Sequence, residues 1–114
     1  MSARSLDING PRRQGNITIE RRVSETGNAI IKVYLHDNLI ATIDYSLRVF
    51  TIRDAGWQTV TTKTAINNVL NQMNSKARVY QKDHQWFIYM IRQESETLVK
   101  TTDEQWQGTK TFAF

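Results

Sequence analysis

The sequence predicts an α+β domain in which one amphipathic helix packs on an antiparallel sheet of about five to six strands. Hydrophobic and polar residues alternate over several short segments, which is typical of half-buried strands. The spacing then changes at residues 66–73 to the three- and four-residue intervals of an amphipathic helix. Strands precede and follow this helix without regular strand–helix alternation, which favours an antiparallel sheet over a parallel one.

The strands are expected where the two-residue period is clear and where turn residues follow. The candidate segments are residues 17–20, 29–35, 39–45, 47–53, 77–82 and 85–92, with a weaker candidate at 97–99. Reversals are predicted at Gly27-Asn28, Asp37-Asn38 and Asp83-His84, because these residue types tolerate turn conformations. Both faces of the 85–92 segment are apolar, which predicts a central or doubly covered strand.

The helix is predicted from the stripe formed by Ile66, Val69, Leu70 and Met73. Thr61 or Thr62 is the expected N-cap, since a threonine hydroxyl can accept a hydrogen bond from a free N–H of the first turn. The helix is expected to stop at residues 74–75. At about 12 residues it would be marginal in isolation, so it must dock on the sheet.

The domain is expected to comprise residues 16–114, preceded by a flexible basic arm over residues 1–15. The arm holds the only proline together with Arg4, Arg12 and Arg13, and it offers little to bury. The 93–114 tail shows only a weak pattern of secondary structure. Trp106 and the apolar residues 111–114 are expected to dock, either on their own domain or on a neighbouring subunit, so a homodimer is left open.

The composition excludes several classes of protein and several kinds of site. The 114 residues include no cysteine, which excludes disulfides and cysteine metal sites and is typical of a reducing cytoplasm. No run of about 18 apolar residues is present, so no membrane-spanning helix is expected, and residues 1–15 do not resemble a secretory signal. The net charge of +4 is uneven, with 13 basic and seven acidic residues over 1–92 but two basic and four acidic residues over 93–114.

The sequence offers little for catalysis. His36 and His84 are the only histidines, and each lies beside an aspartate at a predicted hairpin tip. No metal-ligand spacing, phosphate-binding glycine pattern or nucleophile motif is present. We therefore expect a protein without enzymatic activity, cofactor or metal.

Nucleic-acid binding has more support. Aromatic side chains on a sheet surrounded by Lys and Arg can stack and track a single strand. The candidate residues are Arg12, Arg13, Arg21, Arg22, Lys63, Lys76, Arg78, Tyr80 and Lys82. The strand aromatics could instead belong to the core. The helix start at Thr61, Thr62 and Lys63 could hold a phosphate or could serve only as a cap. An exposed sheet edge could also add a strand from a partner protein.

Four segments of the chain resemble a family of short uncharacterised tailed-bacteriophage proteins. They are the strand Val33–Ala41, the turn Gly56-Trp57-Gln58-Thr59, the Thr61-Thr62-Lys63 helix start with Asn67, and Val79-Tyr80-Gln81-Lys82 followed by Trp86. The resemblance spans roughly residues 29–91. The chain departs from it at Ala65, where members often carry arginine two residues after the lysine.

The resemblance implies a phage protein that acts in the host bacterial cytoplasm, and it implies no particular mechanism. Together with the basic residues, it favours a non-enzymatic phage accessory protein that binds nucleic acid. The alternative is a phage inhibitor that binds a host defence or transcription protein.

Overall fold

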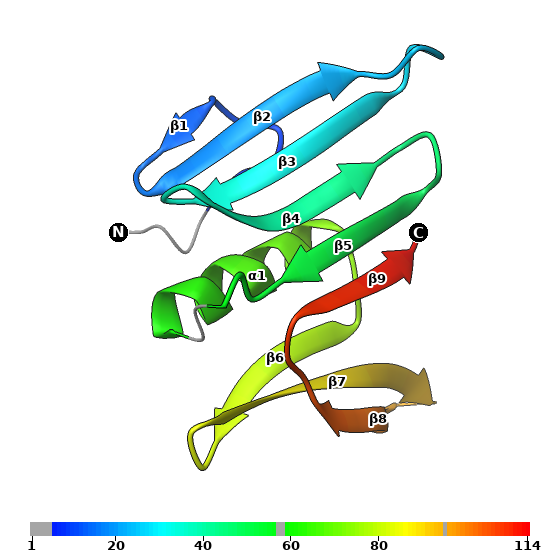
Figure 1. Ribbon diagram of the computed structural model, residues 1–114. Helices are drawn as coiled ribbons and strands as arrows, with labels where there is room; N and C mark the ends of the chain where they lie inside the picture. Colours follow the sequence, from blue (N-terminus) through cyan, green and yellow to red (C-terminus); the bar gives the residue numbers. More distant parts are fainter. Residues whose placement is uncertain (1–5, 57–58, 95) are drawn as a thin grey trace.

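Nine strands form two antiparallel sheets, with one helix between them, in the computed structural model, which describes residues 6–56, 59–94 and 96–114 (Figure 1). The α+β class is therefore confirmed, but the expectation of one sheet with about five to six strands is wrong. The second sheet arises because the strands that follow the helix pair among themselves and not with the strands that precede it.

The large sheet has the order β1-β2-β3-β4-β5-β9. Its strands are β1 (Arg13–Gln14), β2 (Ile17–Val23), β3 (Ala29–Leu35), β4 (Asn38–Asp44), β5 (Val49–Arg53) and β9 (Thr109–Ala113). The first five run as a meander in which each strand pairs with its successor in sequence. Helix α1 (Val60–Gln72) and the small sheet of β6 (Ala77–Lys82), β7 (Gln85–Glu94) and β8 (Thr97–Gln105) lie in sequence between β5 and β9.

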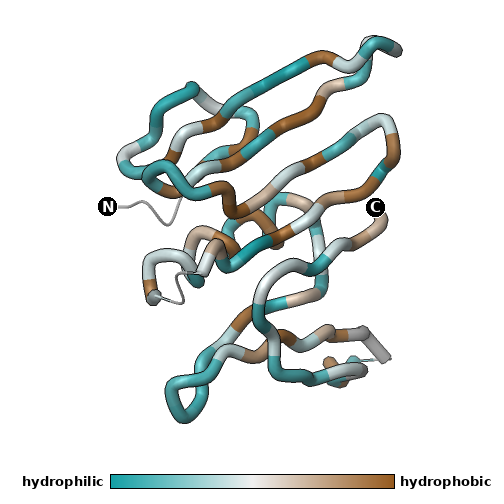
Figure 2. Tube along the Cα trace, viewed as in Figure 1, coloured by the Kyte–Doolittle hydropathy of each residue, from teal (hydrophilic) through white to brown (hydrophobic). Residues whose placement is uncertain are grey.

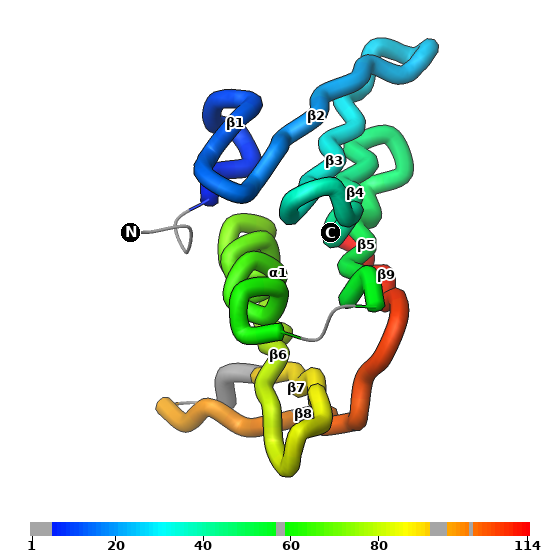
Figure 3. The backbone as a smooth tube through the Cα atoms, turned by 60° about the vertical axis from the view of Figure 1, so that its left-hand side comes forward, coloured from blue at the N-terminus to red at the C-terminus, as the bar shows by residue number. Residues whose placement is uncertain are grey.

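The helix packs on one face of the large sheet, and the small sheet lies below the helix in this view (Figure 3). Hydrophobic positions recur along the strands (Figure 2), and the alternating apolar residues on one face of β2 to β7 are buried. The buried set includes Ile19, Ile31, Val33, Ile43, Phe50 and Ile52 from the large sheet, Ile66, Val69 and Leu70 from the helix, and Val79, Trp86 and Ile88 from the small sheet. All of them belong to one core cluster.

Residues 6–15, expected to be part of a flexible arm, are packed on the domain. Leu6 and Ile8 are buried in the core, and β1 pairs with β2. The Gln72 side chain at the end of α1 accepts a hydrogen bond from the Ile8 N–H (2.7 Å) and donates one to the Leu6 carbonyl. The arm expectation was wrong for this segment because two isolated apolar residues give no periodic signal, while residues 1–5 lie outside the described chain.

The helix begins two or three residues earlier than expected. Thr59 is the N-cap, and its hydroxyl accepts a hydrogen bond from the Thr62 N–H, so the assignment of Thr61 or Thr62 as the cap was wrong. Thr62 is buried instead, with its hydroxyl 3.0 Å from that of Thr59. The sequence could not separate three neighbouring threonines that are all suited to capping.

The pairing of β9 shows where the end of the 93–114 tail packs. β9 pairs with β5 in the same chain, and the Phe112 ring stacks on Phe50 with the ring centroids 5.0 Å apart. Asp54, at the end of β5, accepts a hydrogen bond from the Gly108 N–H at 3.0 Å. Arg48 donates to the Phe114 carbonyl and lies over the Phe114 ring. The tail therefore packs on its own domain.

The small sheet is attached to the helix by Asn67. Its side-chain amide donates to the Val79 carbonyl (2.9 Å) and accepts from the Val79 N–H (2.8 Å), which provides partners for the backbone of β6. The 85–92 strand is the central strand of this sheet, as predicted. β8 continues to Gln105, well beyond the expected 97–99 segment.

Candidate nucleic-acid interface

The two faces of the small sheet differ sharply in chemistry. Side chains directly opposite each other in an antiparallel pair share a face, and the register pairs Arg78 with Tyr89, Tyr80 with Phe87, and Lys82 with Gln85. On the other face, Trp86 and Ile88 are buried in the core cluster that also holds the apolar residues of the helix. The polar and aromatic pairs therefore lie on the outer face, which turns away from the core.

Three aromatic rings form a contiguous cluster on that outer face. The Tyr80 and Phe87 rings are stacked with their centroids 5.4 Å apart, and the Tyr80 and Tyr89 rings are tilted with their centroids 5.5 Å apart. All three residues are half-buried and therefore keep part of their surface in solvent. We call Tyr80, Phe87, Tyr89 and the two β8 residues beside them, Lys100 and Asp103, the aromatic face.

Lys100 and Asp103 contact the tyrosines of the aromatic face from β8. The Lys100 ammonium lies 5.4 Å from the Tyr80 ring centroid and 4.9 Å from that of Tyr89, within the range of a cation–π interaction. The Tyr80 hydroxyl donates to the Asp103 carboxylate, 2.8 Å from Oδ1 and 3.0 Å from Oδ2. Lys100 Nζ is 3.4 Å from Asp103 Oδ2. The Tyr80 ring is thus fixed at its hydroxyl end.

The hydrogen bond to Asp103 raises the pKa of Tyr80, and burial of the hydroxyl and the negative charge of Asp103 raise it further. A folded-state pKa above the unfolded value means that this interaction contributes its full stability below the ordinary tyrosine pKa of 10.0 and loses it as the pH rises through the raised pKa. Asp103→Asn is therefore expected to bring the Tyr80 pKa back down, as measured by tyrosinate absorbance between neutral and strongly alkaline pH.

Glu104→Gln is the matched control for that titration. It removes the same charge from the neighbouring position of β8, where Glu104 pairs with Lys110 and not with Tyr80. Identical tyrosinate titrations for the two variants would contradict the assigned cause of the shift.

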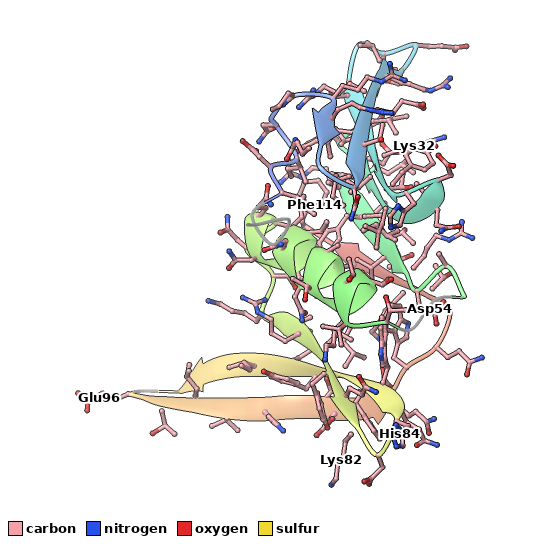
Figure 4. All side chains as sticks on the ribbon, turned by 90° about the vertical axis from the view of Figure 1, so that its left-hand side faces the viewer. Lys32, Asp54, Lys82, His84, Glu96 and Phe114 are labelled. Atoms are coloured by element: carbon pink, nitrogen blue, oxygen red, sulfur yellow. The ribbon has the colours of Figure 1, made fainter. Side chains whose placement is uncertain are left out.

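Several cations surround the aromatic face. Lys82 is exposed at the end of β6 (Figure 4), and Lys76 is exposed just before this strand. Arg78 is half-buried and donates to the carbonyls of Ser75 (2.9 Å) and Ala77 (2.6 Å) and to the Asn71 side chain (3.3 Å). Of the predicted binding residues, Lys76, Arg78, Tyr80 and Lys82 are therefore brought together on or beside β6.

The other predicted arginines lie at the opposite end of the molecule, on β1, β2 and the segment before them (Figure 1). Arg21 donates to the carbonyls of Ile8 (2.9 Å) and Gly10 (3.0 Å), so it holds the N-terminal segment in place. Arg22 forms an ion pair with Glu20 at 2.8 Å, which lowers the pKa of Glu20. Arg12 and Arg13 are exposed. These four residues do not join the aromatic face.

The start of the helix borders a cavity of about 470 Å³. The described residues that line it include His36, Asn38, Thr59, Thr61 and Thr62, but not Lys63. The Thr59 and Thr62 hydroxyls already contact each other, and Thr59 caps the Thr62 N–H. The geometry therefore accounts for Thr59 as the capping residue and for Thr62 as its hydrogen-bonded partner.

Catalytic side chains are sparse in the described structure. His36 and His84 are both exposed at hairpin turns, and each has a positive φ angle. No group of three His, Asp or Glu side chains suited to a metal occurs among the described residues. The helix in the described part of the chain is neither long nor apolar enough to cross a membrane.

A protein-family model described as Kyanoviridae Gp96 protein matches residues 6–113. The chain belongs to this family of phage proteins. The expected resemblance to phage proteins is therefore confirmed. The match does not test the Gly-Trp/Thr-Thr-Lys motif itself, and Trp57 and Gln58 of that motif lie outside the described residues. No curated protein and no solved structure matches the chain.

Four of the five residues of the aromatic face are absent from the predicted set. Lys100 and Asp103 lie in the segment where the strand signal was weak, so nothing placed them beside β7. The sequence predicts Tyr80 as a binding residue, whereas Phe87 and Tyr89 are strand aromatics that could equally belong to the core. The alternation along β7 could have identified Phe87 and Tyr89 as residues of the outer face. Trp86 and Ile88 fill the buried face of this strand, so Phe87 and Tyr89 lie on the other face.

Proposed function

We propose that this phage protein is a non-enzymatic accessory protein that binds single-stranded nucleic acid through the aromatic face of the small sheet, in the host bacterial cytoplasm. The observation that carries the proposal is the half-exposed cluster of Tyr80, Phe87 and Tyr89 bordered by lysines. Unpaired bases stack on aromatic rings of this kind, while cations nearby contact the phosphates.

The charge around the cluster supports a polyanionic ligand. Lys76, Arg78 and Lys82 follow the β6 side of the sheet, and Lys100 lies on the β8 side. A duplex keeps its bases stacked inside and offers no base face to the rings, so a single strand is the form that uses both features of the site. The body of the chain up to residue 92 carries the excess of positive charge, which suits association with phosphates.

The first test is to titrate labelled single- and double-stranded oligonucleotides at two salt concentrations. We expect the single strand to bind more tightly at low salt, with an affinity that falls steeply as salt is added, because each neutralised phosphate releases counterions. Lys82→Gln should reduce the salt slope by about 0.7 for one lost phosphate contact. Absence of binding at low salt would overturn the proposal.

The ring contribution is tested with Tyr89→Ala. We expect single-strand affinity to fall by about 5- to 150-fold, which corresponds to about 1–3 kcal/mol for one lost base stack. Tyr34→Ala is the matched control, because Tyr34 is a half-buried tyrosine on β3 in the large sheet. Equal losses in both variants, with unchanged thermal stability, would argue against the aromatic face as the binding surface.

A second candidate function has its own observation. The β7–β8 hairpin projects from the body, with Glu96 at its tip (Figure 4), and β8 is an edge strand along which Leu98 is 65% exposed. An unpaired edge can add a strand from another protein. This feature suits a phage inhibitor that binds a host defence or transcription protein.

A pull-down from host lysate distinguishes the inhibitor function from nucleic-acid binding. The inhibitor function requires a stoichiometric partner that is retained by the wild-type protein and by Tyr89→Ala, but lost when Leu98→Asp is introduced at the edge. A lysate from which no stoichiometric protein is recovered would count against it.

A further inference from the structure

We propose that Asp103 reads the base edge at the aromatic face and selects guanine over thymine or uracil. This inference rests on the proposed single-strand binding and concerns which base is accepted there. It follows from the order of chemical groups across the small sheet, which runs from cations at β6, through rings on β6 and β7, to the Asp103 carboxylate and its neighbour Lys100 on β8.

The position of Asp103 constrains how a strand can lie. β8 carries Lys100 but also the two carboxylates of Asp103 and Glu104, so its net charge is negative. The sugar–phosphate backbone is therefore favoured on the β6 side, near Lys76 and Lys82. Bases stacked on Tyr80, Phe87 and Tyr89 then extend from β6 towards β8, and their hydrogen-bonding edges reach the Asp103 carboxylate. This carboxylate faces Tyr89 across the strand pair.

The carboxylate is oriented before any ligand binds. Tyr80 donates to both of its oxygens, at 2.8 and 3.0 Å, and Lys100 lies 3.4 Å from Oδ2. A carboxylate can accept about four hydrogen bonds, and the Asp103 side chain is 37% exposed. It therefore keeps acceptor capacity on the solvent side of the aromatic face.

An ionised carboxylate only accepts hydrogen bonds, so it discriminates among bases by their donors. Guanine presents two adjacent donors on its Watson–Crick edge, N1–H and the N2 amino group, and can pair with both oxygens. Cytosine and adenine each present one amino group beside an acceptor nitrogen. Thymine and uracil present a single N–H between two carbonyls, which a carboxylate repels.

The test uses oligo(dT) of about ten nucleotides, a length within the site sizes of single-strand-binding domains, with one central position varied. Wild-type protein is expected to bind the dG-containing strand on the order of tenfold more tightly than all-dT. Deoxyinosine at that position should lose most of the gain, because it lacks the N2 amino group.

Asp103→Asn should abolish the preference for dG, because a carboxamide offers one acceptor oxygen where the carboxylate offers two. Its binding of all-dT should be equal to or tighter than that of the wild type, since a negative charge is removed. Glu104→Gln removes the same charge next to Asp103 and should keep the dG preference. Thermal unfolding of each variant verifies that the fold is intact.

The outcomes distinguish this inference from the function on which it rests. Binding of every oligonucleotide with equal affinity, or a dG preference that survives in Asp103→Asn, would overturn the role of Asp103 and leave single-strand binding standing. Failure of every oligonucleotide to bind at low salt would overturn both.

Discussion

Trp86→Ala is expected to lower the free energy of unfolding by about 3–5 kcal/mol, the usual cost of removing a large buried aromatic side chain. Trp86 is 1% exposed, and its ring stacks on Trp106 with the centroids 6.0 Å apart. It fills the inner face of the small sheet, directly behind the aromatic face. Urea unfolding monitored by circular dichroism measures the loss.

Trp86→Phe is the informative control. The Trp86 indole N–H is buried and has no hydrogen-bond partner among the described residues, so phenylalanine gives up volume but no hydrogen bond. We expect a loss of only about 1–2 kcal/mol. If phenylalanine cost as much as alanine, an indole hydrogen bond would have to be important.

Ile8→Ala is expected to lower the free energy of unfolding by about 2–5 kcal/mol, as for other buried isoleucines. Ile8 is 3% exposed, its N–H donates to Gln72, and its carbonyl accepts from Arg21. The substitution tests the finding that the segment before β1 is part of the core. Denaturant unfolding under the same conditions as for Trp86 gives the comparison.

The neighbouring Asn9→Ala is the control, because Asn9 is exposed and a surface change of this kind alters stability by only about 0.5 kcal/mol or less. Equal stability of Ile8→Ala and the wild type would restore the flexible-arm interpretation of residues 6–15. A large loss confined to Ile8→Ala would also mean that deleting residues 1–15 cannot isolate an electrostatic role for Arg12 and Arg13.

Local patterns predicted much of the fold. The alternation over residues 29–35 predicted a strand, on which Ile31, Val33 and Leu35 prove to be buried, and the stripe through Ile66, Val69 and Leu70 predicted the helix. These predictions succeeded because burial on one face of an element leaves a period in the sequence. Leu6 and Ile8 left no such period. Their side chains are buried in the core cluster, and the Ile8 backbone bonds Gln72 and Arg21, which are distant in sequence.

The candidate site was predicted only in part for the same reason. The cluster around β6 could be predicted because its members, Lys76, Arg78, Tyr80 and Lys82, are close in sequence. The separation of this cluster from Arg12, Arg13, Arg21 and Arg22 depends on which strands pair with each other, and charge counting cannot show it. The roles of Arg21 and Arg22 in hydrogen bonds and ion pairs likewise appear only once their neighbours are known.

By itself, the sequence determined the α+β class, the strand and helix segments with strong periods, the absence of cysteine chemistry and the resemblance to phage proteins. The tertiary structure alone decided that the strands after the helix form their own sheet, that β9 returns to β5, and that Lys100 and Asp103 lie beside Tyr80. Strand pairing is a long-range choice made by the packing of whole faces, whereas the periods that identify each strand are local.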